Sequence, residues 1–145
     1  MSGIDLSDEL LELYNEVKLR SKHKYIIFSL KALAKKKTKV TYGWSIDVKA
    51  DPGGENEAKF EEVLDALPED QAVFVVFDFD DVKPDGRQIK KLLLIKWCPD
   101  AVHFRVKPVI GSTYQTLKEK LTGLGKDIQA VDRSDLEYAS IKASL

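Results

Sequence analysis

The chain has 145 residues, of which 43% are hydrophobic and 32% charged, and its formal net charge is −1 at pH 7. This balance predicts one globular domain over residues 1–145. It argues against nucleic acid as a partner, because the whole chain lacks a strong positive field. The apolar runs are too short for a membrane span, and the start has no secretory pattern. With a single cysteine, the expected compartment is the reducing cytoplasm.

Residues 7–20 have the pattern of an amphipathic helix. Ser7 is a good N-cap residue, because its hydroxyl can accept a hydrogen bond from a free N–H group of the first turn. Leu10, Tyr14 and Val17 then recur at helical spacing and predict the buried stripe.

Two strands and a second helix are expected next. Residues 24–30 are rich in β-forming side chains, and residues 40–46 alternate apolar and polar positions as a half-buried strand does. The lysine-rich residues 31–39 between them are interpreted as a basic connector. After a Pro-Gly-Gly loop at 50–56, a helix is expected to bury one apolar face and to stop at Pro68. That face consists of Phe60, Val63, Leu64 and Leu67.

The middle of the chain predicts the centre of a sheet. Residues 72–79 are almost continuously apolar, as in a strand covered on both faces, and 90–97 form a second such run. The short charged connection at 80–90 predicts an antiparallel hairpin. The class is therefore α+β. We expect a mixed sheet of five strands, with six as the alternative, and helices on both faces.

The last third predicts a helix ending near Leu121, a strand at 127–131 and a final helix capped by Ser134. Pro108 lies inside the first of these patterns, and proline disrupts a helix interior. Two outcomes are open. The helix begins late, near 105–108, which we favour, or it begins after Asp100 and kinks at Pro108.

Signals for catalysis are weak. A Cys98/His103 nucleophile pair has no clear third partner, and Cys98 is more readily a core residue. Asp78, Asp80 and Asp81 form a possible metal cluster, but a solvated strand end is the favoured interpretation. We therefore expect no enzyme activity, no metal and no cofactor.

Three basic clusters remain. The first, Lys35–Lys37 with Lys39, is interpreted as a solvated face, with a nuclear-import signal or a contact for anionic lipid as rivals. The second comprises Arg87, Lys90 and Lys91, and the third comprises Arg105 and Lys107. These two flank the central hairpin strand and its exit, which favours a binding role.

Four stretches of the chain are informative together: LYNEVKLRSKHKYIIF (13–28), FEEVLDALPEDQAVFVVFDFD (60–80), LLLIKWCPDA (92–101) and TLKEKLTGLGKDIQAVDRSDLEY (116–138). Their order and spacing resemble the actin-depolymerising factor/cofilin family over essentially the whole chain. The resemblance implies the single ADF-homology fold, a gelsolin-like sheet. It also implies a monomeric protein that binds actin monomers and filaments, severs filaments and speeds their depolymerisation.

By position, the resemblance also implies two actin surfaces. The monomer-side surface would contain Ser2, Gly3, Ile4, Arg105, Lys107, Pro108 and Ser112. The filament-side surface would contain Arg87, Lys90 and Lys91. Phosphorylation of Ser2 would block binding, because a phosphate adds nearly two negative charges. Phosphoinositides would compete with actin for the basic groups.

Residues 107–114, KPVIGSTY, depart from the K-M-hydrophobic-Y-A-S-S-K stretch that is usual in the family. Pro108 replaces a methionine and Gly111 an alanine. This departure keeps open an alternative in which the protein binds actin monomers or filament sides without severing. A phosphoinositide-binding scaffold and a Cys98/His103 hydrolase are less favoured. The implied location is the cytoplasm and cytoskeleton, with nuclear entry open.

Overall fold

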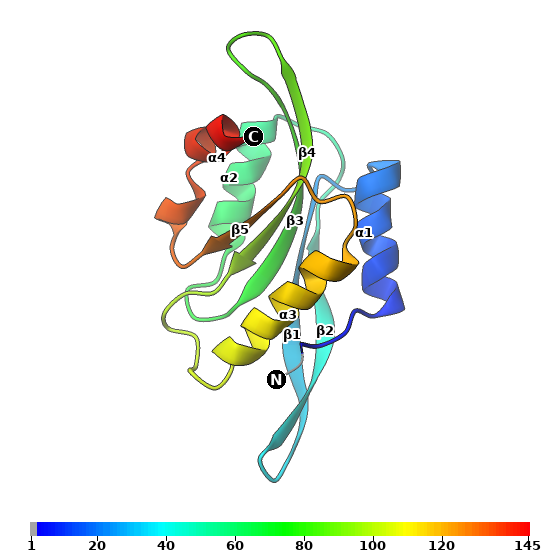
Figure 1. The fold of residues 1–145 in the computed structure, drawn as a ribbon, viewed down its shortest axis with the longest axis vertical. Helices are drawn as coiled ribbons and strands as arrows, with labels where there is room; N and C mark the ends of the chain where they lie inside the picture. The colour runs from blue at the N-terminus through cyan, green and yellow to red at the C-terminus, as the bar shows by residue number, and fades with distance from the viewer. Residues whose placement is uncertain (1–2) are drawn as a thin grey trace.

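The computed structural model describes residues 3–145, and this part of the chain folds around one open sheet of five strands (Figure 1). The strand order is β2-β1-β3-β4-β5, with parallel pairing only between β4 and β5. The strands are β1 (Tyr25–Lys36), β2 (Lys39–Lys49), β3 (Val73–Val82), β4 (Gln88–Trp97) and β5 (Lys126–Ala130). The prediction of a mixed sheet with an antiparallel central hairpin is confirmed.

Helices cover both faces of the sheet, as expected. One face carries α1 and α3, and the other carries α2 and α4 (Figure 1). The α-helices are α1 (Asp8–Arg20), α2 (Asn56–Ala66), α3 (Lys107–Lys120) and α4 (Tyr138–Ser144), with a short 3-10 turn, η1 (Arg133–Leu136), before α4. Helix α3 forms the crossover that parallel pairing of β4 with β5 requires.

The core consists of two apolar layers, one on each side of the sheet. Alternation along β3 sends Phe74 and Val76 into the layer under α1 and α3, and Val75 and Phe77 into the layer under α2 and α4. All four side chains are fully buried. This double coverage explains the continuous apolar run of the central strand.

The first helix follows its sequence signals. The Ser7 hydroxyl accepts a hydrogen bond of 3.1 Å from the Leu10 N–H, as expected of an N-cap residue. Leu10, Tyr14 and Val17 are buried. The sequence pattern therefore predicted α1 correctly.

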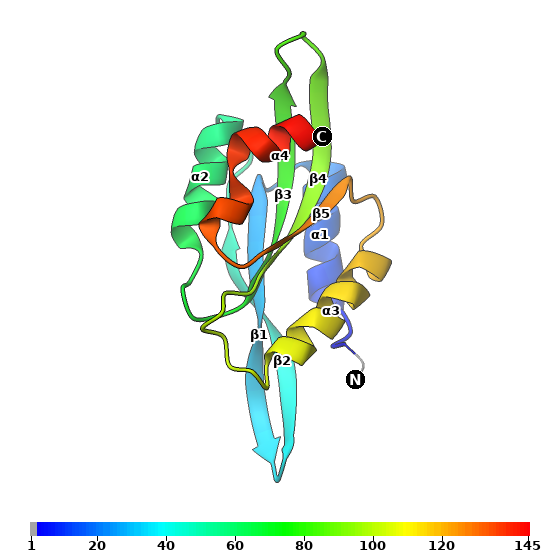
Figure 2. The same cartoon turned by 60° about the vertical axis from the view of Figure 1, so that its left-hand side comes forward.

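The interpretation of residues 31–39 as a connector is wrong. Strand β1 continues to Lys36, and a two-residue turn at 37–38 leads directly into β2, with Lys37 at φ 56°. Strand β1 pairs with β3 only through residues 25–28, so residues 29–45 form a two-stranded ribbon, which we call the β1–β2 arm. The arm extends beyond the rest of the molecule (Figures 1 and 2).

The central hairpin is longer than expected. Its strands extend to Val82 and resume at Gln88, so that only residues 83–87 form the turn. Gly86 adopts φ 89° there, a conformation that glycine tolerates at no steric cost. Ladder pairing thus continues through charged residues that the sequence pattern assigned to a connection.

Ser134 does not cap the last helix. Asp132 caps η1 instead, and its carboxylate accepts the Ser134 N–H at 2.9 Å. Asp135 completes a capping box by accepting the Asp132 N–H at 3.3 Å. The chain is extended at Glu137, which splits the expected single helix into η1 and α4.

Candidate functional site

Helix α3 begins late. Lys107 is its first residue and Pro108 its second, and residues 100–106 form turns. Within these turns the Val106 N–H donates to the His103 carbonyl at 2.9 Å. Proline is tolerated at the start of a helix, because the first N–H groups have no intrahelical acceptor. The favoured late start is confirmed, and the early start with a kink at Pro108 is wrong.

The N-terminal segment lies directly on α3. The Ile4 N–H donates to the Thr113 hydroxyl at 3.1 Å. Gly3 is so close to the helix that an added Cβ would lie 2.4 Å from the Ser112 carbonyl oxygen. The structure therefore brings Gly3, Ile4 and Ser112 together. Ser2 lies outside the described residues.

The turns before α3 present an exposed stack of three side chains. The His103 ring stacks on Phe104 with 4.7 Å between centroids, and the Arg105 guanidinium lies 5.6 Å from the Phe104 ring centroid. Phe104 is 70% exposed, which is unusual for so large an apolar side chain. Sequence reasoning missed it, although its position beside Arg105 was a usable signal.

Lys107 is held differently from Arg105. Its side chain is half-buried, and its ammonium group donates to the Asp100 carbonyl at 3.1 Å. Arg105 is exposed. The two cations therefore adjoin the helix start, but Lys107 is held by the Asp100 carbonyl, whereas Arg105 is exposed and lies over the Phe104 ring.

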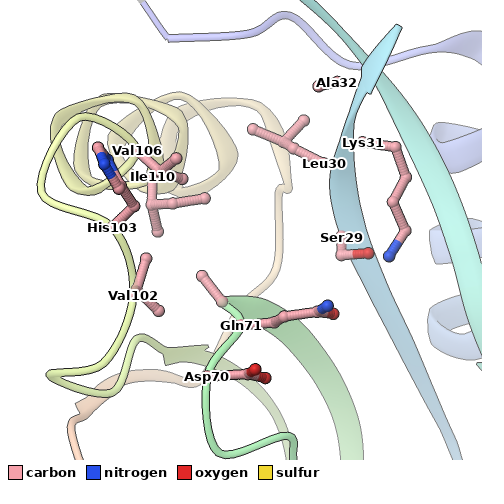
Figure 3. A pocket seen from close by; sticks show the side chains of 11 residues that line it. Ser29, Leu30, Lys31, Ala32, Asp70, Gln71, Val102, His103, Val106 and Ile110 are labelled. Atoms are coloured by element: carbon pink, nitrogen blue, oxygen red, sulfur yellow. The ribbon is translucent and has the colours of Figure 1, made fainter.

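A hollow of about 250 Å³ separates these turns from β1 (Figure 3). Val106 and Ile110 face Leu30 across it, while Asp70 and Gln71 lie along its lower edge in this view. The wall is largely apolar, so the hollow offers packing surface rather than a set of catalytic groups.

The three basic residues of the β3–β4 hairpin do not share one face. Lys90 lies 3.6 Å from Asp78 and 3.8 Å from Asp80, whereas strand alternation directs Lys91 to the opposite face. Arg87, the last residue of the turn, pairs with Asp85 at 2.7 Å. Lys91 is exposed.

The acidic cluster is not a metal site in this structure. Among residues 3–145, no group of three or more histidine, cysteine or acidic side chains is arranged to hold a metal ion. Asp81 instead accepts a hydrogen bond from Tyr138 and pairs with Lys142 at 3.2 Å. The Tyr138 bond is the main cause of the lowered pKa of Asp81. The solvated-end interpretation also fails for Asp78, which is buried.

A buried polar network anchors the base of the hairpin. The Lys24 ammonium donates to the Asn56 side-chain oxygen at 2.7 Å and to the Asp78 carbonyl at 2.5 Å. The Asn56 amide donates to the Tyr138 hydroxyl at 2.6 Å. Burial lowers the pKa of Lys24, an effect that the nearby Asp78 opposes. The network joins the residue that precedes β1 to α2, β3 and α4, and sequence reasoning did not find it.

The nucleophile hypothesis gains no support. Burial raises the pKa of the Cys98 thiol, which disfavours the reactive thiolate. Within residues 3–145 the structure contains no hydrogen bond between Cys98 and His103, whose Nδ1 accepts the Arg105 N–H at 3.1 Å.

No helix within residues 3–145 has the length and hydrophobicity needed to cross a bilayer.

The protein therefore belongs to a class with an open mixed sheet between two helical layers. In this protein the N-terminal segment also packs on α3, the helix that follows β4. Among solved structures, actin depolymerization factor 2 of Plasmodium berghei has this fold. It aligns with a TM-score of 0.84 at 19% identity, covering 100% of this chain and 99% of that chain. This likeness establishes the fold.

Relatives in sequence and a family match identify the family as well as the fold. Actophorin of Entamoeba histolytica is 31% identical over 145 residues, covering 100% of this chain and 96% of the relative. Cofilin of Eremothecium gossypii is 33% identical over 141 residues, covering 97% and 90%. The family described as "Cofilin/tropomyosin-type actin-binding protein" matches residues 3–145. The chain belongs to this family.

Proposed function

We propose that this protein binds actin monomers and filaments and promotes filament severing and depolymerisation. Residues 1–145 act as a single ADF-homology domain. The observation that carries the proposal is the docking of Gly3 and Ile4 onto Ser112 and Thr113, beside the exposed Arg105. The names of the relatives, cofilin and actophorin, favour this function over binding without severing.

The monomer-side surface is formed by the N-terminal segment and the start of α3. We assign to it Ser2, Gly3, Ile4, Arg105, Lys107, Pro108 and Ser112. Arg105 supplies an exposed positive charge, and Pro108 gives a rigid, exposed first turn of α3. Phe104 adds an exposed aromatic face beside Arg105, and phenylalanine and arginine are both enriched at protein–protein interfaces.

The filament-side surface is assigned to the β3–β4 hairpin, with Arg87, Lys90 and Lys91. Lys91 is the principal cation in this assignment. Its charge projects from the face opposite the acids that neutralise Lys90. A filament contact on that face would lie close to α4, which packs on the same side of the sheet.

Further parts of the proposal concern regulation and location. Phosphorylation of Ser2 would add negative charge two positions before Ile4 in the chain and oppose actin binding. Phosphoinositides would compete through the basic groups. The protein acts as a monomer in the cytoplasm and cytoskeleton, with access to the nucleus, and it is not an enzyme.

The monomer surface is tested with Arg105→Ala/Lys107→Ala. We expect the affinity for ADP-actin monomers to fall at least about tenfold, because both cations adjoin the helix start. The melting temperature should be nearly unchanged. Arg20→Ala/Lys22→Ala is the matched control, since it removes the same two residue types from an exposed site at the C-terminal end of α1.

Unchanged affinity of the Arg105/Lys107 double variant would disprove the site assignment. Severing is tested separately by imaging filaments with substoichiometric wild-type protein. Frequent breaks are expected, and stable decoration without breaks would instead support the non-severing alternative.

A further inference from the structure

The β1–β2 arm, the N-terminal segment and α3 enclose a groove of about 610 Å³. Three elements that are distant in sequence form it, and two of them belong to the proposed monomer-side surface. Its lining residues are Ile4, Lys35, Lys37, Thr38, Lys39, Val40, Tyr42, Arg105 and Val109. We call it the arm groove.

The arm groove is strongly cationic. Four of its nine lining residues are lysine or arginine, and none is acidic. In the described part of the chain, none of these four cations forms an ion pair, although nine such contacts occur elsewhere. Unpaired like charges around one hollow repel each other, so an anionic occupant would relieve that repulsion.

Apolar side chains lie between the cations. Val40 and Tyr42 come from the same face of β2, and Ile4 and Val109 close the groove from the N-terminal segment and α3. Lys35 is the cross-strand partner of Val40 and therefore projects on the same face. The arm groove thus combines a positive rim with an apolar interior.

We propose that the arm groove binds an acidic peptide segment bearing an apolar side chain, located on the actin molecule that α3 contacts. The inference rests on the proposed function. Ile4 and Arg105 belong both to the groove and to the monomer-side surface, so one partner can cover both without a break. A concave site with an apolar interior fits a protruding chain better than the flat surface of a bilayer.

The test compares two double variants of equal charge. Lys35→Ala/Lys37→Ala removes two cations from the arm groove, whereas Lys31→Ala/Lys36→Ala removes two from the same arm outside it. Affinity for ADP-actin monomers is measured at low and at raised salt. We expect the groove variant to bind about tenfold more weakly at low salt, with a smaller salt dependence, because two screened charge contacts are lost. The control should stay within about twofold.

Equal affinities for the two variants, with wild-type binding intact, would overturn the arm-groove assignment and leave the proposed function standing. If wild-type protein failed to bind actin, both the arm-groove assignment and the proposed function would be wrong. Binding to phosphoinositide vesicles is measured in parallel. A groove variant that loses vesicle binding but keeps full actin affinity would also overturn the proposal, in favour of a lipid ligand.

Discussion

At the scale of single residues, Gly3 controls how the N-terminal segment lies on α3. A methyl group there would meet the Ser112 carbonyl carbon at 2.6 Å as well as the Thr116 hydroxyl at 2.6 Å. We predict that Gly3→Ala lifts the segment and breaks the hydrogen bond from the Ile4 N–H to Thr113. Hydrogen exchange at the Ile4 amide should become markedly faster, and actin affinity should fall.

The global stability of Gly3→Ala should change little, because the displaced segment is terminal. Trp44 offers a second readout, since its indole N–H donates to the Asp5 carbonyl at 2.8 Å. Protection of the Ile4 amide equal to that in the wild type would show that the close approach is relieved without moving the segment.

Asn56 is the second residue whose replacement should have a large effect. Its side-chain oxygen accepts from Lys24 and from the Asp80 N–H, and its amide donates to Tyr138. Asn56→Ala removes these three hydrogen bonds from the buried network, so we predict a loss of about 2–4 kcal/mol in the free energy of unfolding. Urea denaturation measures it.

The matched control is Lys59→Ala, which breaks an exposed pair with Glu62 on the same helix and should cost less than about 1 kcal/mol. Similar losses for the two variants would mean that the Asn56 network contributes little to stability.

Residue roles could be predicted where their partners are local. The Ser7 cap bonds a residue three positions away, within reach of a sequence pattern. The bonds of Asn56 to Lys24 and Tyr138 span 32 and 82 positions. The exposed stack on Phe104 likewise depends on how the turns before α3 fold, which the apolar pattern did not reveal.

At the scale of elements, Gly111 weakens α3. It lies inside the helix, and a Cβ added there would meet nothing within 4 Å. Gly111→Ala should therefore raise the free energy of unfolding by about 0.5–1 kcal/mol, because alanine restricts the unfolded chain more than glycine does. A higher melting temperature would be the readout, and a decrease would reveal a backbone requirement at this position.

Among the elements, the start of α3 was predictable because Pro108 restricts the backbone by itself. The extension of β1 through residues 31–36 was not predictable, because lysine has low β propensity and these residues continue a ladder with β2 that begins in the core. The split of the last helix into η1 and α4 was also not predicted from the sequence. Asp132 and Asp135 form a cap that competes with Ser134.

At the scale of the whole molecule, three buried tyrosine hydroxyls bind separate helices to their surroundings. Tyr14 donates to the Thr122 carbonyl at 2.7 Å and Tyr114 to Asp127 at 2.7 Å, while Tyr138 belongs to the Asn56 network. Burial raises the pKa of Tyr14 from 10.0 to about 12 and also raises the pKa values of Tyr114 and Tyr138.

A pKa raised by folding gives stability that is complete below the unfolded value and is lost as pH rises through the folded value. We therefore predict that the free energy of unfolding falls from about pH 10 to about pH 12. Tyr14→Phe should be less stable by about 1 kcal/mol below about pH 9, yet show a shallower alkaline decline. Urea titrations across this range test it, and parallel curves would contradict it.

The overall class was predictable, since the doubly buried β3 and the amphipathic helices specify a sheet with two helical layers. The hydrophobic pattern does not predict which segments that are distant in sequence come into contact. The arm groove joins Ile4, Val40 and Arg105, which no local pattern connects.

The β1–β2 arm has a consequence for how freely the protein can vary. Residues 29–45 pair with no third strand, and an isolated two-stranded ribbon is only marginally stable in water. The ribbon should therefore open and close many times within the lifetime of the folded core, exposing its lysines to trypsin first. Because its tip contributes little to either apolar layer, its length and charge can be altered almost without loss of stability. The tip of the arm can therefore be exchanged while the two apolar layers that stabilise the fold stay unchanged.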